Sequence, residues 1–241
     1  MNKKASFLLA SMITIIVAGN YIFFADDGVV REKVEIVRVL DGDTVELSDG
    51  RKIRLLNINT PEKGLSYSTL GKEYLSEFTD IELESAGLDK YDRTLGRLYY
   101  NEIYINLEIV KQGFAHTYLV DESEKRLFDN AERNARENQI NIWEKSEFYD
   151  CLEVEINKYD EYLLIEDSCG VNIIGWSVKD ESTKSYEFEK DLGEKFKLHS
   201  GKGSDDSENI YWGRENIWND DHDEVFIRDS DGFLAYYYSY G

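Results

Sequence analysis

The chain of 241 residues has little proline, cysteine or histidine, with one, two and three residues respectively. A single proline excludes collagen-like arrays and Pro-rich linkers. The histidines are scattered singly, so together with two cysteines they do not form the ligand set of a structural zinc site. Positive charge is also scarce, since 28 Lys and Arg stand against 49 Asp and Glu and leave a net charge of −21. Such a surface as a whole repels phosphate backbones, so any contact with nucleic acid would have to be confined to a local site.

The chain does contain enough apolar material to fold. Hydrophobic residues make up 41% of the sequence and aromatic residues 13%. This composition excludes a disordered polyelectrolyte, because cores of ordinary size can be buried. At roughly 100–200 residues per domain, the length fits one or two domains.

The N-terminus has the pattern of a targeting segment. Lys3 and Lys4 precede an apolar run over residues 5–24, which Asp26 and Asp27 close. A run of this length can cross a bilayer as a helix, and lysines before such a run remain in the cytoplasm. We expect residues 1–27 to be an N-terminal transmembrane anchor, with a cleaved signal peptide as the alternative. Either case places the folded part outside the cytoplasm, secreted or at the cell surface.

Charge and pattern divide the rest of the chain near residue 150. Residues 31–149 carry 17 basic and 24 acidic side chains (net −7), and residues 150–241 carry 9 and 23 (net −14). In the first segment we expect strands at 34–40, 44–48, 52–58 and 81–85, with Asp-Gly turns between the first three. We also expect a hairpin over 95–105 with Asn101 and Glu102 near its turn, and helices at 71–78, 105–115 and about 122–138. About five strands with interposed helices predict a closed five-stranded β-barrel of the OB type.

The last of these helices has a start signal and an apolar stripe. Asp121 and Glu124 are spaced like a capping box, which predicts that their side chains cap the first turn. Leu127, Ala131 and Ala135 follow at helical spacing and are expected to face the core.

The second segment shows no helical stripe. Short strands are expected at 152–156, 162–167, 173–180, 185–189, 194–200, 224–229 and 233–240, and these predict an all-β sandwich of immunoglobulin type. Cys151 and Cys169 flank the first hairpin, which folds about Asp160 and sets the two positions opposite each other. In an exported chain they can form a disulfide, and two free buried thiols are the alternative.

Polar residues interrupt the strands of the first segment where packing does not require them. They are Asp41 and Asp43 in DGDT, Arg54 at the start of RLLNINTPE, Asn59, Thr60 and Glu62 at its end, and Arg93 and Arg97 in DKYDRTLGR. Carboxylate and amide oxygens suit a hard cation such as Ca²⁺, and arginine forks pair with phosphate oxygens. In this order the residues predict a metal-assisted attack on a phosphodiester, with one carboxylate orienting or deprotonating water.

Residues 34–145 resemble the staphylococcal nuclease-like, or thermonuclease, domain. The resemblance is carried by VLDGDTVEL, IRLLNINTPE, DKYDRTLGRLYY, INLEIVKQGFA and the closing INIW. It implies an OB-fold enzyme, here over residues 31–149, that hydrolyses DNA or RNA with Ca²⁺. By motif position it implies metal ligands at Asp43, Asn59 and Thr60 with Asp41 nearby, catalytic roles for Arg54, Glu62 and Arg93, and a terminal-phosphate site at Lys90 and Tyr91.

The chain departs from the family pattern at two positions beside these residues. Asn59 stands where the best-known members have aspartate, so the Ca²⁺ site should be weaker by one negative charge. Asp92 precedes the second arginine in place of a small residue, so its carboxylate is expected to compete with phosphate for Arg93. Because Arg54, Glu62 and Arg93 are all retained, an active nuclease is still expected. The departures motivate the alternative of a catalytically weak or inactive cell-surface binding protein that uses the barrel for nucleic acid or a protein partner.

Residues 150–241 resemble a lamin-tail domain. The resemblance is carried by EYLLIED, NIIGWSVKD and the stretch from IYWGREN to DSDG. It implies a surface for adhesion or substrate positioning, with a partner at the cell surface and no chemistry of its own.

Overall fold

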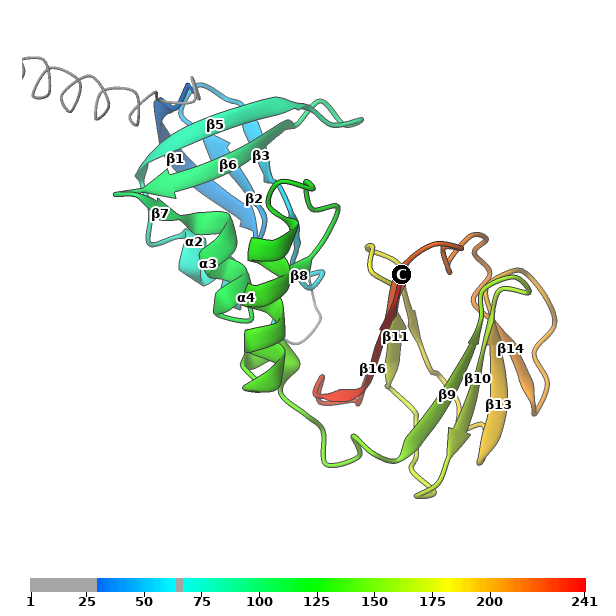
Figure 1. Ribbon diagram of the computed structural model, residues 1–241. Coiled ribbons are helices and arrows are strands. Elements are labelled where there is room, and N and C mark those ends of the chain that lie inside the picture. The colour runs from blue at the N-terminus through cyan, green and yellow to red at the C-terminus, as the bar shows by residue number, and fades with distance from the viewer. Residues whose placement is uncertain (1–29, 64–66) are drawn as a thin grey trace, which may run out of the picture. The chain divides into compact units, whose positions relative to one another are not determined.

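Five strands close a barrel in the first half of the chain, in the computed structural model that describes residues 30–63 and 67–241 (Figure 1). They are β1 (Glu32–Asp41), β2 (Thr44–Leu47), β3 (Lys52–Leu55), β5 (Asp80–Leu88) and β6 (Thr94–Tyr100). The sheet order is β3-β2-β1-β5-β6, and β3 pairs with β6 in parallel, which closes the sheet on itself. Alternate residues point inward because side chains alternate along a strand, so Val45, Ile53, Leu83 and Leu98 are fully buried. The predicted OB-like barrel is confirmed.

The remaining elements of this half lie around the barrel. Two short strands, β4 (Ile58–Asn59) and β8 (His116–Thr117), pair with each other, and β7 (Ile103–Tyr104) pairs with β6. The helices are α2 (Leu70–Leu75), α3 (Ile105–Lys111), α4 (Lys125–Glu137) and a short 3₁₀ helix, η1 (Asn141–Trp143).

The expected start of the last α-helix is wrong in detail. Glu124 is the N-cap residue of α4 but makes no side-chain cap hydrogen bond. Its carboxylate and that of Asp121 instead accept hydrogen bonds from Arg97. Of the expected stripe, Ala131 and Ala135 are buried, whereas Leu127 is 48% exposed and Phe128 is buried in its place.

The second half contains two four-stranded sheets. One has the order β14-β13-β10-β9 and the other β12-β11-β15-β16. Their strands are β9 (Leu152–Asn157), β10 (Tyr162–Asp167), β11 (Ser177–Lys179), β12 (Ser185–Glu187), β13 (Lys195–His199), β14 (Asn209–Tyr211), β15 (Asp223–Arg228) and β16 (Leu234–Tyr240). Both sheets contribute to one buried core, which includes Leu163, Trp176, Phe196 and Val225. These sheets are consistent with an additional β domain, and β14 is a strand that the sequence pattern missed.

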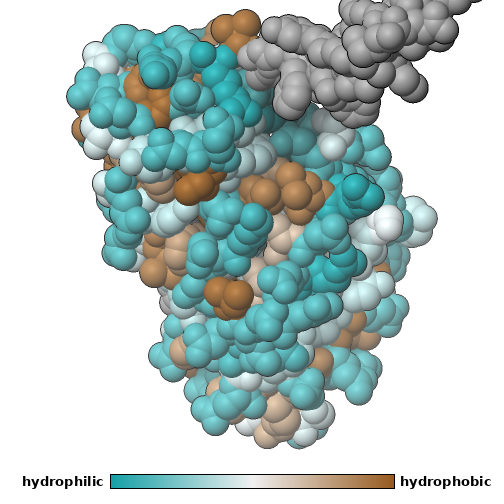
Figure 2. All heavy atoms as spheres, turned by 60° about the vertical axis from the view of Figure 1, so that its left-hand side comes forward, coloured by the Kyte–Doolittle hydropathy of each residue, from teal (hydrophilic) through white to brown (hydrophobic). Residues whose placement is uncertain are grey.

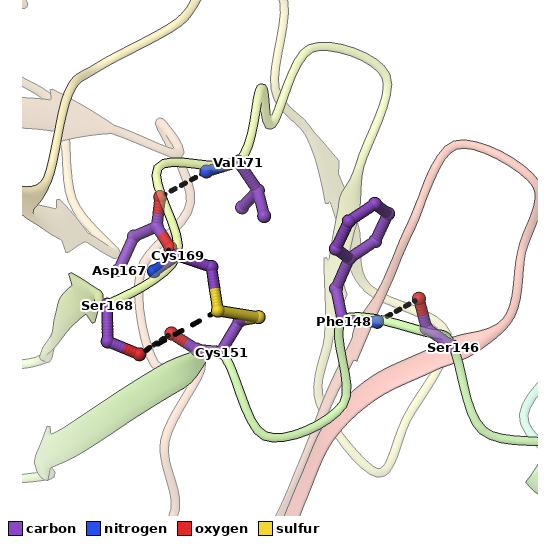
Figure 3. Close-up of a disulfide and its surroundings, with 7 residues drawn as sticks. All are labelled: Ser146, Phe148, Cys151, Asp167, Ser168, Cys169 and Val171. Carbon is purple, nitrogen blue, oxygen red and sulfur yellow. Dashed lines mark hydrogen bonds between the residues drawn. A yellow bond between two sulfur atoms is a disulfide. The ribbon is translucent and has the colours of Figure 1, made fainter.

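A disulfide joins Cys151 and Cys169 across the first hairpin of this half (Figure 3). Strands β9 and β10 pair antiparallel with Leu152 opposite Asp167. Cys151 directly precedes β9 and Cys169 lies two residues after β10, so both cysteines lie at the open end of the hairpin. The turn after β10 is held by Asp167, whose carboxylate accepts hydrogen bonds from the backbone N–H groups of Cys169 and Val171.

The outward face of the β12-β11-β15-β16 sheet is covered by residues of the first half. Phe226 and Leu234 share a small buried cluster with Ala135, Ile142 and Trp143. Arg136 of α4 adds a hydrogen bond to the Tyr237 hydroxyl at 2.9 Å. By its internal contacts the chain from Lys33 to Gly241 therefore forms one unit.

The surface drawn in Figure 2 is mostly hydrophilic, and its hydrophobic residues form small separate patches. The excess of acidic over basic residues in the sequence is in keeping with such a surface. The expected targeting segment at 1–27 lies outside the described residues. Among the helices of the described residues, none is both long and apolar enough to cross a membrane.

Candidate active site

The first two candidate residues lie in the turn from β1 to β2. Asp41 ends β1, and its carboxylate accepts a hydrogen bond from the backbone N–H of Asp43 at 3.2 Å. Gly42 between them allows close packing, since a Cβ there would lie 2.9 Å from the Thr60 side chain. Desolvation, followed by the negative charge of Asp43, raises the pKa of Asp41 to about 6. Two carboxylates that share a site in this way favour the arrival of a cation.

Asp43 connects three segments of the barrel. Its side chain is 9% exposed, and its Oδ2 lies 3.1 Å from Nη2 of Arg54. The same oxygen accepts hydrogen bonds from the backbone N–H and the hydroxyl of Thr60, both at 3.2 Å. Its other oxygen accepts a hydrogen bond from the Thr44 hydroxyl at 2.9 Å. The strand pairing positions these groups, because Thr44 is opposite Arg54 in the β2–β3 register.

Arg54 is held rigidly beneath this carboxylate. Its Nη1 donates to the backbone carbonyls of Leu55 and Ile58, at 2.6 and 2.9 Å, and its side chain is 12% exposed. Its Nη2 faces both Asp43 and the amide oxygen of Asn59, the latter at 3.4 Å. A guanidinium fixed on one edge keeps its other edge oriented for a phosphate oxygen.

Asn59 is buried, and its amide is engaged on both sides. Its oxygen faces Arg54, while its Nδ2 donates to the backbone carbonyls of Ser182 and Glu181 at 3.0 and 3.4 Å. The pairing of β4 with β8 places His116 opposite Asn59, and Nε2 of His116 lies 2.9 Å from the same Glu181 carbonyl. Burial, followed by the positive charge of Lys179, lowers the pKa of His116 well below its usual range.

Residues 181–182 follow β11 in the second half, so the second half touches the candidate site directly. Nothing in the sequence pattern signals this contact. A bond between a side chain at 59 and carbonyls at 181–182 depends on how two folded layers meet, and His116 reads as an ordinary packing residue from sequence.

Glu62 follows this segment and is exposed to solvent. It lies two residues after Thr60, which contacts Asp43 directly, and it forms no ion pair within the described part of the chain. Electrostatically it also interacts with Lys179. An exposed carboxylate in this position can contact water.

Arg93 directly precedes β6, the strand that pairs with β3. Arg54 pairs with Leu95 in the parallel register, which puts the Cα atoms of the two arginines about 8 Å apart at ordinary strand spacings. Nε of Arg93 donates to the Asp89 carboxylate at 2.7 Å. The expected competitor for Arg93 is therefore wrong: Asp89 is its partner, whereas Asp92 has a positive φ of 60° and is exposed in the turn.

Lys90 and Tyr91 occupy the same turn between β5 and β6. Nζ of Lys90 lies 5.0 Å and the guanidinium of Arg93 5.6 Å from the centre of the Tyr91 ring. The ring itself is 67% exposed. Lys90 and Tyr91 are exposed and Arg93 beside them is half-buried. In the second group of candidate residues, Asp43, Asn59 and Thr60 are buried, Arg54 is half-buried and Asp41 is exposed.

Arg97, by contrast, belongs to the framework. Its side chain is 13% exposed and forms ion pairs with Glu84, Asp121 and Glu124. The pKa of Arg97 is raised by Glu124 although burial opposes this. Its role is to tie β6 to the loop before α4.

The side-chain atoms near Asp43 that could bind a metal ion are oxygens. Across residues 30–63 and 67–241, no group of three or more His, Cys, Asp or Glu side chains is arranged to hold a metal ion. Two carboxylates, an amide oxygen and the Thr60 backbone are nevertheless the donor types that Ca²⁺ prefers. The residues fit a hard cation that also draws on backbone oxygen and water.

Comparison with known proteins places the first half of the chain. Residues 52–145 match the family described as Staphylococcal nuclease homologue. An uncharacterized endonuclease of Haemophilus influenzae is 37% identical over 122 residues, which covers 47% of this chain and 68% of that protein. The thermonuclease of Staphylococcus intermedius is 29% identical over 130 residues (47% and 77%), and the micrococcal nuclease of Shigella flexneri is 28% identical over 126 (45% and 72%). The chain therefore belongs to the family of staphylococcal nuclease homologues.

Proposed function

We propose that this protein is a Ca²⁺-dependent nuclease that hydrolyses phosphodiester bonds of DNA or RNA outside the cytoplasm. The observation that carries the proposal is the contact of Asp43 with both Arg54 and Thr60, in a chain that belongs to a nuclease family. Thermonuclease and micrococcal nuclease among its relatives support the reaction class.

The two arginines bind the phosphate that is attacked. The Nη2 edge of Arg54, which also contacts Asp43 and Asn59, and the guanidinium of Arg93 hold phosphate oxygens and stabilise the extra negative charge of the transition state. Arg93 must exchange its hydrogen bond with Asp89 for one with phosphate. Lys90 and Tyr91 in the same turn then hold the terminal phosphate of the nucleotide.

Glu62 prepares the attacking water. Its carboxylate is exposed and accepts a proton from, or orients, a water molecule on the side of the phosphate opposite the leaving oxygen. Asp41, Asp43, Asn59 and the backbone oxygen of Thr60 would hold Ca²⁺. When bound, the ion neutralises charge on the phosphate oxygens.

Residues 150–241 act, in this proposal, as a lamin-tail-like domain that holds the catalytic segment and contacts a partner at the cell surface. Its contribution to the site is supported by the hydrogen bonds from Asn59 to Glu181 and Ser182. These bonds fix the segment that leads from Asn59 to Glu62. Two backbone carbonyls can only accept hydrogen bonds, and so can a carboxylate. The hydrogen bonds to Glu181 and Ser182 therefore explain why an amide, which can donate, stands at position 59.

Export is proposed from the apolar run over residues 5–24, as an uncleaved anchor or a cleaved signal peptide. The disulfide between Cys151 and Cys169 supports it, because disulfides persist in oxidising compartments.

A second candidate function is a binding protein without turnover. It is favoured by the amide of Asn59, which is occupied by Arg54 and the two carbonyls, and by the ion pair of Arg93 with Asp89. Under this alternative the barrel holds nucleic acid or a protein and cleaves neither.

The deciding experiment incubates the full chain with single-stranded DNA, once with Ca²⁺ and once with a chelator. The nuclease proposal predicts cleavage only with Ca²⁺, and a loss of about 10²–10³-fold in rate for Arg93→Ala. Arg214→Ala, an exposed arginine of the second half, is the matched control and should leave the rate unchanged. DNA that is retained but never cleaved, with any divalent ion, would favour the binding protein.

A further inference from the structure

A cavity of about 220 Å³ lies on the outward face of the β12-β11-β15-β16 sheet, next to the candidate active site. Pro61, which immediately precedes Glu62, forms part of its wall. One water molecule occupies ~30 Å³ in the liquid, so the cavity has room for a solute of several heavy atoms. Its floor comes from strands that no part of the nuclease reaction uses.

The floor is polar and follows from the strand register. Ser177 is opposite Arg228 in the β11–β15 pair, and Lys179 is opposite Ser185 in the β11–β12 pair. Ser177 and Lys179 lie two residues apart, so all four side chains project from the same face of the sheet. Ser230, in the turn after β15, adds a third hydroxyl to the lining.

Two cations lie in this floor, and carboxylates act on them only at longer range: Asp180, Glu224 and Glu62 on Lys179, and Asp229 on Arg228. Lys179 is 9% exposed and its ammonium donates to the carbonyls of Asp180 and Ser182. Arg228 donates to the carbonyl of Gly232 at 3.1 Å. Neither forms an ion pair with a carboxylate among residues 30–63 and 67–241. Desolvation lowers the pKa of Arg228 to about 10, so it remains charged at pH 7. Charges removed from water without a partner are unfavourable, and an anion between them would compensate.

The two carboxylates that border the cavity do not neutralise these cations. The Asp229 carboxylate accepts hydrogen bonds from the Ser146 hydroxyl and from the backbone N–H groups of Asp231 and Phe233. Glu187 is exposed at the end of β12. The hydroxyls of Ser177, Ser185 and Ser230 make no hydrogen bond within the described part of the chain, and they are free to donate.

We propose that this cavity is a phosphate-binding site, in which Arg228 and Lys179 supply charge and the three serine hydroxyls donate to the phosphate oxygens. A phosphate ion has several acceptor oxygens that point in different directions, and the serine hydroxyls and the two cations of the floor can each donate to one of them. The planar guanidinium of Arg228 can make paired hydrogen bonds to phosphate oxygens. The phosphate comes either from the nucleic acid strand, next to the bond attacked, or from free inorganic phosphate. The site itself does not depend on the proposed nuclease activity; only the first of these sources does.

The test measures binding of inorganic phosphate to the full chain by titration calorimetry at pH 7, without divalent ions. Arg228→Gln should weaken phosphate binding about 10- to 100-fold, because it removes one charge-assisted hydrogen bond. The double variant Ser177→Ala, Ser185→Ala leaves the charges in place and should weaken it less. Arg214→Gln, an exposed arginine in the same half, is the control for charge and should bind as the parent does. Thermal unfolding of each variant shows whether it is folded.

Two further measurements identify where the phosphate comes from and at which site it binds. An oligonucleotide added in chelator should displace phosphate if the cavity takes a phosphate of the strand, and should leave it bound if the site serves free phosphate; either result keeps the site. Arg93→Gln marks the candidate active site: a phosphate bound there would be lost in this variant, whereas the phosphate bound in the cavity would stay. Binding that is lost with Arg93→Gln but kept with Arg228→Gln, or no binding by the parent, would overturn the proposal.

Discussion

Replacing Asn59 by aspartate separates the two roles of this position most clearly. The new side chain would restore the third negative charge expected of the metal site. It would also remove the amide N–H groups that now bond to Ser182 and Glu181. A buried carboxylate oxygen would then face two carbonyl oxygens with no proton between them.

The magnitude can be worked from these contacts. The bond to Ser182 at 3.0 Å has full strength and contributes about 1 kcal/mol, whereas the 3.4 Å contact with Glu181 contributes little. A buried acceptor left without a donor adds about 2 kcal/mol, a figure that already allows for the cation of Arg54 at 3.4 Å. The total loss of about 3 kcal/mol should lower the melting temperature by about 6–12 °C.

Thermal unfolding in chelator is the assay. Asn101→Asp, in an exposed turn at φ 46°, is the matched control and should change the melting temperature by less than about 2 °C. Added Ca²⁺ should recover part of the loss in Asn59→Asp, because an ion that binds only the folded state stabilises it. A melting temperature for Asn59→Asp equal to that of the control would refute the contact between Asn59 and residues 181–182.

Three other outcomes follow from the fold. Replacing Cys151 and Cys169 by serine opens a loop with a sequence separation of 18 residues and should cost about 3 kcal/mol, read as a lower urea midpoint; an unchanged midpoint would contradict the disulfide. Arg97→Gln leaves the Glu84, Asp121 and Glu124 carboxylates without their cation and should cost about 3 kcal/mol in the same assay, and a loss below about 0.5 kcal/mol would show that the ion pairs do not stabilise the fold. Glu224 has its pKa raised to about 8, first by burial and then by the charge of Glu132. The folded state therefore binds a proton more tightly, and the stability this provides is complete below pH 4.5 and lost as the pH rises to 8. Glu224→Gln should flatten that decline in urea midpoints, and an unaltered pH profile would contradict the assignment.

The barrel was predictable because its signals are local. Alternating apolar residues, Asp-Gly turns and the Asn101–Glu102 turn each depend only on residues that are close in sequence. Asn101 and Glu102 both have the positive φ of a tight hairpin turn. The same locality explains the disulfide, since a hairpin about Asp160 sets position 151 near position 169.

The errors arose where partners are distant in sequence. Glu124 has the spacing of a capping residue, but Arg97 on a neighbouring strand is a stronger partner for its carboxylate. Arg93 pairs with Asp89 rather than with its neighbour Asp92, because the left-handed turn at Asp92 brings the two ends of the turn together. β14 escaped detection because three residues are too few for an alternating pattern.

The contact of the second half with the site could not be derived from sequence. Lys179 falls on the same side of β11 as Ser177, the side expected to be polar. From sequence it would be taken for a lysine exposed to solvent on the outer face of the sheet. Only the packing of Phe226 and Leu234 against Trp143 and Ile142 reveals that this face is covered.

The single-turnover rate of Glu62→Gln tests the central claim most directly. The substitution keeps the shape of the side chain and removes the group proposed to prepare water. With a single-stranded oligonucleotide and saturating Ca²⁺, the rate should fall about 10²–10⁴-fold, with the Kd for the oligonucleotide within about threefold of the parent and with exposed Glu137→Gln behaving as the parent does. Cleavage by Glu62→Gln at the parental rate would contradict the account.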